Sequence, residues 1–159
     1  MTPPRLQRGL TGLLIALLLN LSGAQGELQR VDGWIAEPPP GSLILAGYLT
    51  LQNPGTESRS LVGISSPQFS RVEVHRTVIV DGLARMEALP RIDIPVGGRL
   101  NMQPGGAHLM LIDPVARLER GERVKLHLEF DDGSAQVVVL EVRSRREAGT
   151  PGGHDHHHR

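Results

Sequence analysis

The sequence has 159 residues, with 17 Lys and Arg against 17 Asp and Glu, so its formal net charge is zero. This length fits one domain. The balanced charge excludes the strong field by which a protein attracts nucleic acid or an anionic membrane. Cysteine is absent, which excludes disulfides, a thiol nucleophile, thiolate zinc sites, acylation on cysteine and the blue-copper electron-transfer site, whose copper needs a thiolate.

Residues 1–26 have the pattern of a secretory signal peptide. Arg5 and Arg8 supply a positive start, residues 10–21 (LTGLLIALLLNL) are mostly apolar, and small residues suited to a signal peptidase follow at 22–26. The alternative is an uncleaved anchor, but this apolar stretch is shorter than the about 20 residues that a membrane-spanning helix needs. We therefore expect an exported protein that has no stable membrane insertion after cleavage.

The body of the chain, residues 27–143, reads as short strands joined by turns, because its Gly and Pro content favours turns over long helices. Strands are expected at residues 31–37, 43–52, 60–65, 71–80, 83–89, 91–94, 98–102, 108–112, 123–130 and 136–142. No long stretch has a helical period, and we find no internal repeat. The pattern predicts one all-β domain, an antiparallel Greek-key β-sandwich or barrel.

Two hairpins are expected at Asp-Gly turns, a strong hairpin signal between alternating strands. One turn is at residues 81–82, and the other is at residues 131–133 (DDG). In the second hairpin, alternate side chains should face the core, namely Val124, Leu126, Leu128 and Phe130. His127 then lies on the outward face, where an ordinary exposed histidine is expected.

Four residues are spaced so that they can form one site: His75, ten residues, Met86, 21 residues, His108, one residue and Met110. With a two-residue loop at 81–82, Met86 is a diagonal neighbour of His75 on one face of the hairpin, at a Cα separation of about 7–8 Å. A bulge or a longer loop would break this register. His108 and Met110 are i and i+2 on one strand, so they also share a face.

The chemistry of these side chains predicts a copper site. A thioether is soft and uncharged, a poor ligand for Mg²⁺, Ca²⁺ or Zn²⁺ and a good one for Cu(I), while imidazole accepts copper in either oxidation state. Each residue alone has an ordinary explanation, because a single Met usually fills a core. That role is expected for Met102, which continues the alternation of Leu100.

This set resembles the signature of the periplasmic copper chaperone family PCu(A)C, which is His, ten residues, Met, 21 residues and His-x-Met. Other segments also fit that family: AGYLTLQNPG at 46–55, SSPQFSRVEVH at 65–75, PGGAHLMLI at 104–112 and RGERVKLHLEFDDG at 120–133. The resemblance covers roughly residues 31–143.

The resemblance implies a cupredoxin-like β-sandwich in the periplasm that binds Cu(I) through His75, Met86, His108 and Met110. The implied role is not enzymatic: the protein delivers copper to the dinuclear copper centre of cytochrome c oxidase, often alongside a Sco-type thiol protein. Many family members carry Met directly after the first His, whereas this sequence has Arg76. This departure removes no core ligand and bears on exposure or docking at the site.

The tail, residues 144–159, is expected to be disordered, because Gly, Pro and charged residues dominate it. It contains a cluster of histidines, His154, His156, His157 and His158. Imidazoles in a flexible segment suit Cu(II), so the tail is a candidate second site. The alternatives are a purification tag and a solvated tail without a role.

Three other functions remain open at this point. A periplasmic copper-sequestering or resistance protein would use the same four ligands without delivery. A small copper oxidase or monooxygenase would usually need more histidines than the two in the predicted core. A metal-free structural β-sandwich would leave the His/Met spacing as coincidence.

Overall fold

The computed structural model describes residues 27–144 and residue 146. The expected signal peptide and the histidines of the tail lie outside these residues, so the predicted chain divisions at 26 and 143 stay predictions. The described residues form strands β1 (Gln29–Ala36), β2 (Ile44–Gln52), β3 (Arg59–Ser65), β4 (Phe69–Val80), β5 (Leu83–Ala88), β6 (Ile92–Ile94), β7 (Arg99–Asn101), β8 (Ala107–Pro114), β9 (Arg123–Phe130) and β10 (Ala135–Arg143). The all-β prediction is confirmed.

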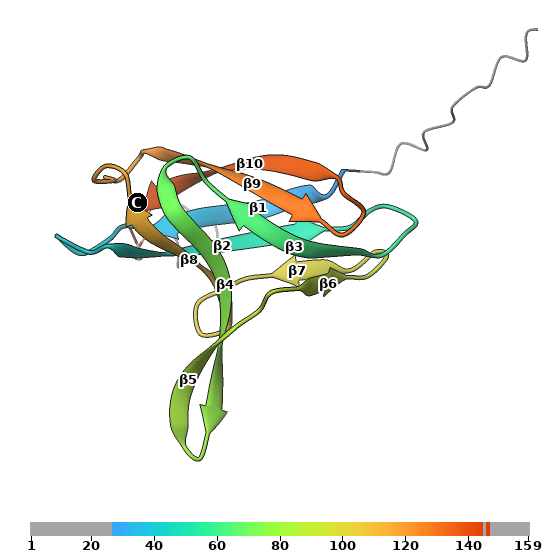
Figure 1. The fold of residues 1–159 in the computed structure, drawn as a ribbon, viewed down its shortest axis with the longest axis horizontal. Coiled ribbons are helices and arrows are strands. Elements are labelled where there is room, and N and C mark those ends of the chain that lie inside the picture. Colours follow the sequence, from blue (N-terminus) through green and yellow to red (C-terminus); the bar gives the residue numbers. More distant parts are fainter. Residues whose placement is uncertain (1–26, 145, 147–159) are drawn as a thin grey trace, which may run out of the picture.

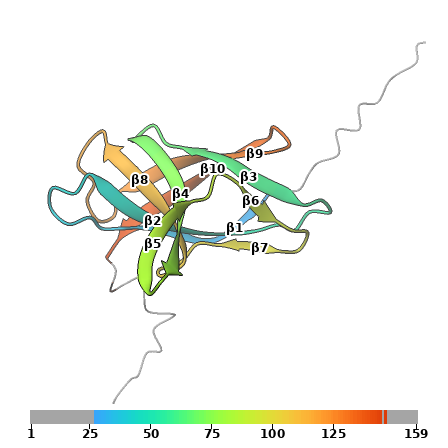
Figure 2. The ribbon, with the colours of Figure 1, turned by 60° about the horizontal axis from the view of Figure 1, so that its bottom comes forward.

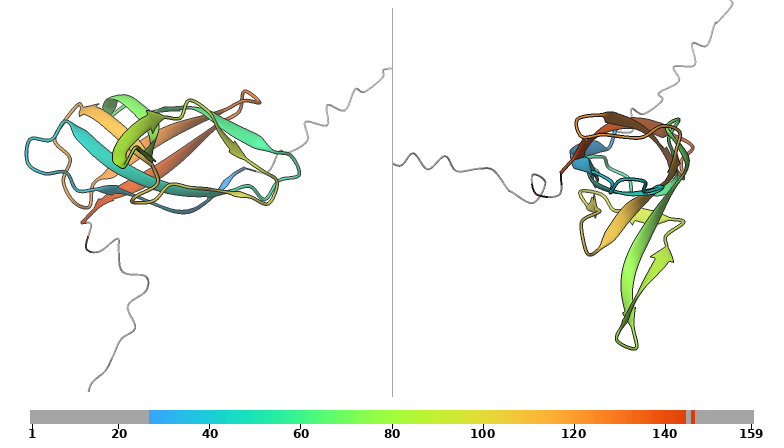
Figure 3. Two further views of the ribbon diagram at one scale, coloured as in Figure 1. Left: turned by 90° about the horizontal axis from the view of Figure 1, so that it is seen from below. Right: turned by 90° about the vertical axis from the view of Figure 1, so that its left-hand side faces the viewer.

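The strands form one mixed sheet in the order β5-β4-β8-β2-β1-β10-β9-β3-β6, and β7 also pairs with β2. The sheet curls into an open barrel, seen end-on in the right panel of Figure 3, in which β3 and β4 approach each other without being hydrogen-bonded neighbours. The predicted antiparallel pairing holds except between β1 and β10, which are parallel. The first and last strands of the domain thus lie side by side and run in the same direction.

The core consists of inward side chains that alternate along the strands, as the period of two predicts. In β9, Val124, Leu126 and Leu128 are fully buried and Phe130 is nearly so, while Lys125 and Glu129 are exposed. Met102 is buried in the same core. Both the predicted alternation of β9 and the predicted core role of Met102 are confirmed.

The β4–β5 hairpin has the predicted register. Asp81 and Gly82 both have positive φ, 53° and 76°, as a type I′ turn requires. Val80 then pairs with Leu83, and the register continues without a bulge to the pair of His75 with Ala88. The loop length alone was therefore enough to predict the pairing across this hairpin.

The β4–β5 hairpin projects from the barrel, as Figure 1 and the right panel of Figure 3 show, and it points toward the viewer in Figure 2. All six residues of β5 are exposed, whereas the first half of β4 contributes the buried Val72 and Val74 to the core. One strand thus runs from the core of the barrel out into solvent. No helix among the described residues has the length and apolarity needed to cross a membrane.

Candidate metal centre

The four predicted ligands lie on three strands that are adjacent in the sheet. His75 is on β4, Met86 is on β5, and His108 and Met110 are on β8, within the order β5-β4-β8. His75 is directly opposite His108 in the β4–β8 register. Their ring centroids are 6.5 Å apart, and the ring planes are inclined by 38°. The fold therefore brings together two histidines that are 33 positions apart in the chain.

These side chains lie on the outer face of the sheet, because the residues that alternate with them are in the core. The buried neighbours are Val72 and Val74 on β4 and Leu109 and Leu111 on β8. His75, His108 and Met110 therefore point away from the core, and each is partly exposed. Met110 is opposite Glu73 on β4.

Met86 lies further out along the hairpin than the two histidines. It pairs with Thr77, which shares the outer face of β4 with His75. Met86 is therefore the diagonal neighbour of His75, as the loop length predicted. Its side chain is 62% exposed. The register gathers all four residues on one face, and their joint binding of a metal ion remains a prediction.

Hydrogen bonds set the orientation of both imidazole rings. His75 Nε2 is 2.8 Å from Glu73 Oε2, and Glu73 Oε1 is 2.9 Å from Arg71 Nε. On β8, His108 Nδ1 is 3.1 Å from the carbonyl oxygen of Gly106. The second nitrogen of His75, Nδ1, is buried and has no hydrogen-bond partner. In each ring, one nitrogen therefore has a hydrogen-bond partner: Nε2 in His75 and Nδ1 in His108.

Our sequence interpretation did not include Glu73. The signal that could have found it is its position two residues before His75, since residues i and i+2 of a strand share a face. Arg76, the departure from the family pattern, lies on the opposite face of β4 from His75. Its Nη2 is 3.3 Å from Glu87 Oε2, so it pairs with the hairpin rather than with the predicted ligands.

The other histidine of the described domain is not part of this group. His127 is on β9, where it lies opposite Ser65 on one side and Val137 on the other, and it is partly exposed as predicted. Among residues 27–144 and 146, no three His, Asp or Glu side chains are grouped so that they could hold a metal ion. The thioethers of Met86 and Met110 stay the predicted further ligands beside His75 and His108.

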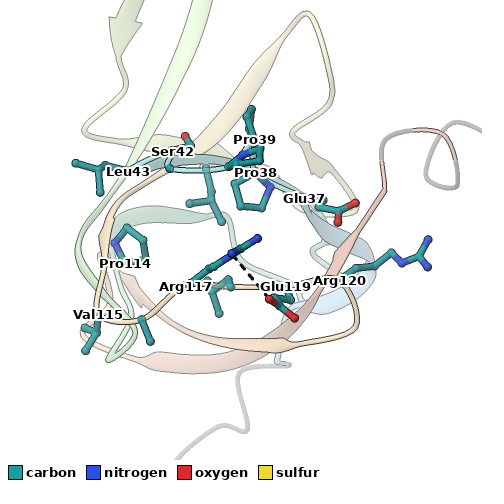
Figure 4. Close-up of a pocket in the computed structure, with 15 residues that line it drawn as sticks. Glu37, Pro38, Pro39, Ser42, Leu43, Pro114, Val115, Arg117, Glu119 and Arg120 are labelled. Carbon is teal, nitrogen blue, oxygen red and sulfur yellow. Dashed lines mark ion pairs between the residues drawn. The ribbon is translucent and has the colours of Figure 1, made fainter.

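A cavity of about 590 Å³ lies between the β1–β2 and β8–β9 connections (Figure 4). It is next to Pro114, at the end of β8 away from His108. An ion pair between Arg117 and Glu119, with an N–O distance of 3.8 Å, lies in its wall. Neither His75 nor His108 lines this cavity, so it is separate from the candidate metal centre.

A family model described as "Putative lipoprotein LpqE-like" matches residues 28–142. The chain belongs to the LpqE-like family. One relative is "Putative lipoprotein Lxx21020" of Leifsonia xyli, which is 33% identical over 154 residues that cover 87% of this chain and 90% of that protein. Another is "Uncharacterized protein RP573" of Rickettsia prowazekii, which is 34% identical over 101 residues, 61% of this chain and 54% of that protein.

Solved structures share the fold of this LpqE-like chain. The copper-bound PCuAC domain from PmoF2 is 22% identical, with a TM-score of 0.62 over 76% of this chain and 96% of that one. CuI-DR1885 from Deinococcus radiodurans is 31% identical, with a TM-score of 0.60 over 78% of this chain and 84% of that one. The predicted resemblance to PCu(A)C domains and the cupredoxin-like fold are confirmed.

Proposed function

We propose that this LpqE-like protein is a copper chaperone that carries Cu(I) at His75, Met86, His108 and Met110. The observation that carries the proposal is the direct opposition of His75 and His108, with ring centroids 6.5 Å apart, on three adjacent strands that also present the two methionines. The similar domains of PmoF2 and DR1885, solved with copper and with Cu(I), support copper as the ion.

The residues fit Cu(I) in both chemistry and local structure. Two imidazoles and two thioethers make a soft, uncharged donor set, which favours Cu(I) over hard divalent ions. His75 Nδ1 is buried without a partner, and an unsatisfied buried polar group costs about 1–3 kcal/mol. A bound metal ion would remove that cost, because it would take the lone pair that no donor in the protein takes.

The exposure of the site suits transfer by ligand exchange. Met86 is mostly exposed on a projecting hairpin, whereas only 16% of the His75 side chain is exposed. A partner would therefore reach the Met86 side of the ion first and replace the protein ligands one at a time. Each step exchanges one ligand for another, and no bond of a substrate is made or broken, so the function requires no catalytic turnover.

The recipient that we propose is the dinuclear copper centre of cytochrome c oxidase, in the periplasm, with a Sco-type thiol protein as a further partner. The leader pattern at residues 1–26 and a relative named as a lipoprotein support export. The lipid anchor does not transfer from that name, because this sequence contains no cysteine.

The test is a Cu(I) titration of residues 27–150 against a competing chromophoric chelator. We expect one tight equivalent, which is lost or greatly weakened in Met86→Ala and His108→Ala. Leu83→Ala, an exposed residue of the same hairpin, and His127→Ala are matched controls that should keep wild-type affinity. Binding that is indifferent to both ligand substitutions would show that copper binds elsewhere.

Copper sequestration is separated from delivery by a transfer assay. The Cu(I)-loaded protein would be mixed with the soluble copper-binding domain of the oxidase subunit, and copper in each would be measured after separation. Delivery predicts copper in the oxidase domain. Copper that stays on the chaperone, while the oxidase domain is empty and able to bind copper, would favour sequestration.

A further inference from the structure

The two nitrogens of the His75 ring have different surroundings. Nε2 is 2.8 Å from the Glu73 carboxylate, which has no hydrogen to donate when ionised and therefore accepts the hydrogen of Nε2. Nδ1 is buried and has no partner among the protein atoms. A neutral imidazole with its hydrogen on Nε2 has its free lone pair on Nδ1.

Glu73 is itself held in place. Its other carboxylate oxygen, Oε1, is 2.9 Å from Arg71 Nε, and the alternation of β4 puts Arg71, Glu73 and His75 on the same outer face. Each carboxylate oxygen thus has a partner on the strand. A carboxylate is also a hard ligand that suits Cu(I) poorly. The arrangement therefore favours Glu73 as a support for His75 rather than as a fifth copper ligand.

We infer that Glu73 is a positioning residue that holds the hydrogen of His75 on Nε2, so that His75 binds copper through Nδ1. This inference rests on the proposed copper site. Metal-binding histidines commonly donate their other N–H to a carboxylate or a backbone carbonyl, which fixes the tautomer and orients the ring. His108 has the second kind of support, at Nδ1 from the Gly106 carbonyl, and so binds through Nε2.

The site therefore uses different nitrogens of its two histidines. The Arg71–Glu73–His75 row on β4 supports one ring, and the turn before β8 supports the other. Because the two supports come from different segments of the chain, a substitution at Glu73 should disturb the orientation of His75 and leave His108 unchanged.

The first experiment needs no copper. Long-range proton–nitrogen NMR spectra of the ¹⁵N-labelled mature protein report which nitrogen of each neutral ring carries the hydrogen. We expect the Nε2–H tautomer for His75 in the wild type, and a loss of that preference in Glu73→Ala. Glu73→Gln should keep it, because its amide oxygen can accept the same hydrogen. Glu87→Ala, which removes the carboxylate of the Arg76 pair, is the matched control and should match the wild type.

The second experiment identifies the bound nitrogen and the effect on affinity. Ag(I) would serve as a diamagnetic substitute for Cu(I). Coupling to silver is then expected at Nδ1 of His75 and at Nε2 of His108. Loss of an outer hydrogen-bond partner typically costs about 10–100-fold in metal affinity, so we expect a decrease of that size for Cu(I) in Glu73→Ala, with Glu73→Gln closer to wild type.

The results separate this inference from the proposed function. A wild-type His75 with its hydrogen on Nδ1, silver coupling at His75 Nε2, or unchanged Cu(I) affinity in Glu73→Ala would overturn the role of Glu73 while leaving the four-ligand site in place. Wild-type affinity in His75→Ala and His108→Ala would instead overturn the site itself. Glu73 is partly exposed, so its variants are expected to fold, and the same spectra check this.

Discussion

The β4–β5 and β9–β10 hairpins have similar turn sequences and opposite surroundings. Both turn at Asp-Gly, with φ of 76° at Gly82 and 78° at Gly133. In the β9–β10 hairpin every second residue faces the core. In the β4–β5 hairpin, β5 has no buried residue at all. A turn that contains Asp-Gly thus joins a buried hairpin in one place and an exposed one in the other, although only the exposed turn also has positive φ at its aspartate, Asp81.

The difference indicates what each hairpin contributes. Burial of apolar side chains supplies most of the stability of a fold, so β9 and β10 stabilise the barrel. A two-stranded hairpin in water is only marginally stable, and regions with few buried contacts open most easily. The β4–β5 hairpin, which carries Met86, is therefore expected to open more easily than the β9–β10 hairpin, and under the proposed function this would ease release of the ion.

The largest expected effect is on the free energy of unfolding when a core residue of the buried hairpin is shortened. Leu126 is fully buried, so Leu126→Ala should cost about 2–5 kcal/mol. Leu83→Ala removes the same atoms from an exposed position of β5 and should change stability by less than about 0.5 kcal/mol. Urea unfolding measures both, and similar losses in the two variants would contradict the contrast between the hairpins.

A smaller effect is expected from alanine at the two turn glycines. No atom lies within 4 Å of a Cβ built at either Gly82 or Gly133, so the cost is backbone strain alone, about 1–2 kcal/mol for a left-handed residue. Gly133→Ala should lower the global free energy of unfolding by this amount. Gly82→Ala should mainly weaken Cu(I) binding, because the β4–β5 hairpin can open without unfolding the barrel.

Two measurements distinguish these outcomes. Urea unfolding reports the global loss, and amide hydrogen exchange reports local opening of β5. A Gly82→Ala variant that loses as much global stability as Gly133→Ala, with unchanged Cu(I) affinity, would show that the exposed hairpin is a structural part of the barrel.

Local patterns were sufficient to predict the strands and the turns. The Asp81-Gly82 loop fixed the pairing of Thr77 with Met86 because a two-residue turn allows one register. The alternation in β9 likewise identified its buried face, and the spacing of His75, Met86, His108 and Met110 identified the candidate site. Each of these inferences uses residues that are close in sequence or a period that one strand sets by itself.

Pairings between distant strands could not be predicted in this way. The direct opposition of His75 and His108 depends on the register between β4 and β8, which are not consecutive in the chain, so no single turn sets it. The parallel contact of β1 with β10 joins the two ends of the domain. The support of His75 by Glu73 depends on side-chain rotamers, which the strand period limits to a face without choosing the hydrogen-bond partner.

The smallest expected effect concerns acid stability at the β9–β10 turn. Asp131 accepts hydrogen bonds from the backbone N–H of Ser60 and from Arg91, at 2.9 and 2.7 Å. These bonds hold the pKa of Asp131 below its ordinary value of 3.8. A lowered pKa in the folded state stabilises the protein above the unfolded pKa, and this contribution is lost as the pH falls through the folded pKa.

Asp131→Asn should therefore be less stable than the wild type at neutral pH, and the difference should shrink as the pH falls below 3.8 toward the lowered pKa. Urea unfolding at a series of pH values measures it. Asp81→Asn changes the same residue type at the exposed turn, where a type I′ loop also accepts Asn, and should follow the wild type. A constant difference between Asp131→Asn and the wild type at every pH would show that Asp131 contributes through its hydrogen-bond geometry, not through its charge.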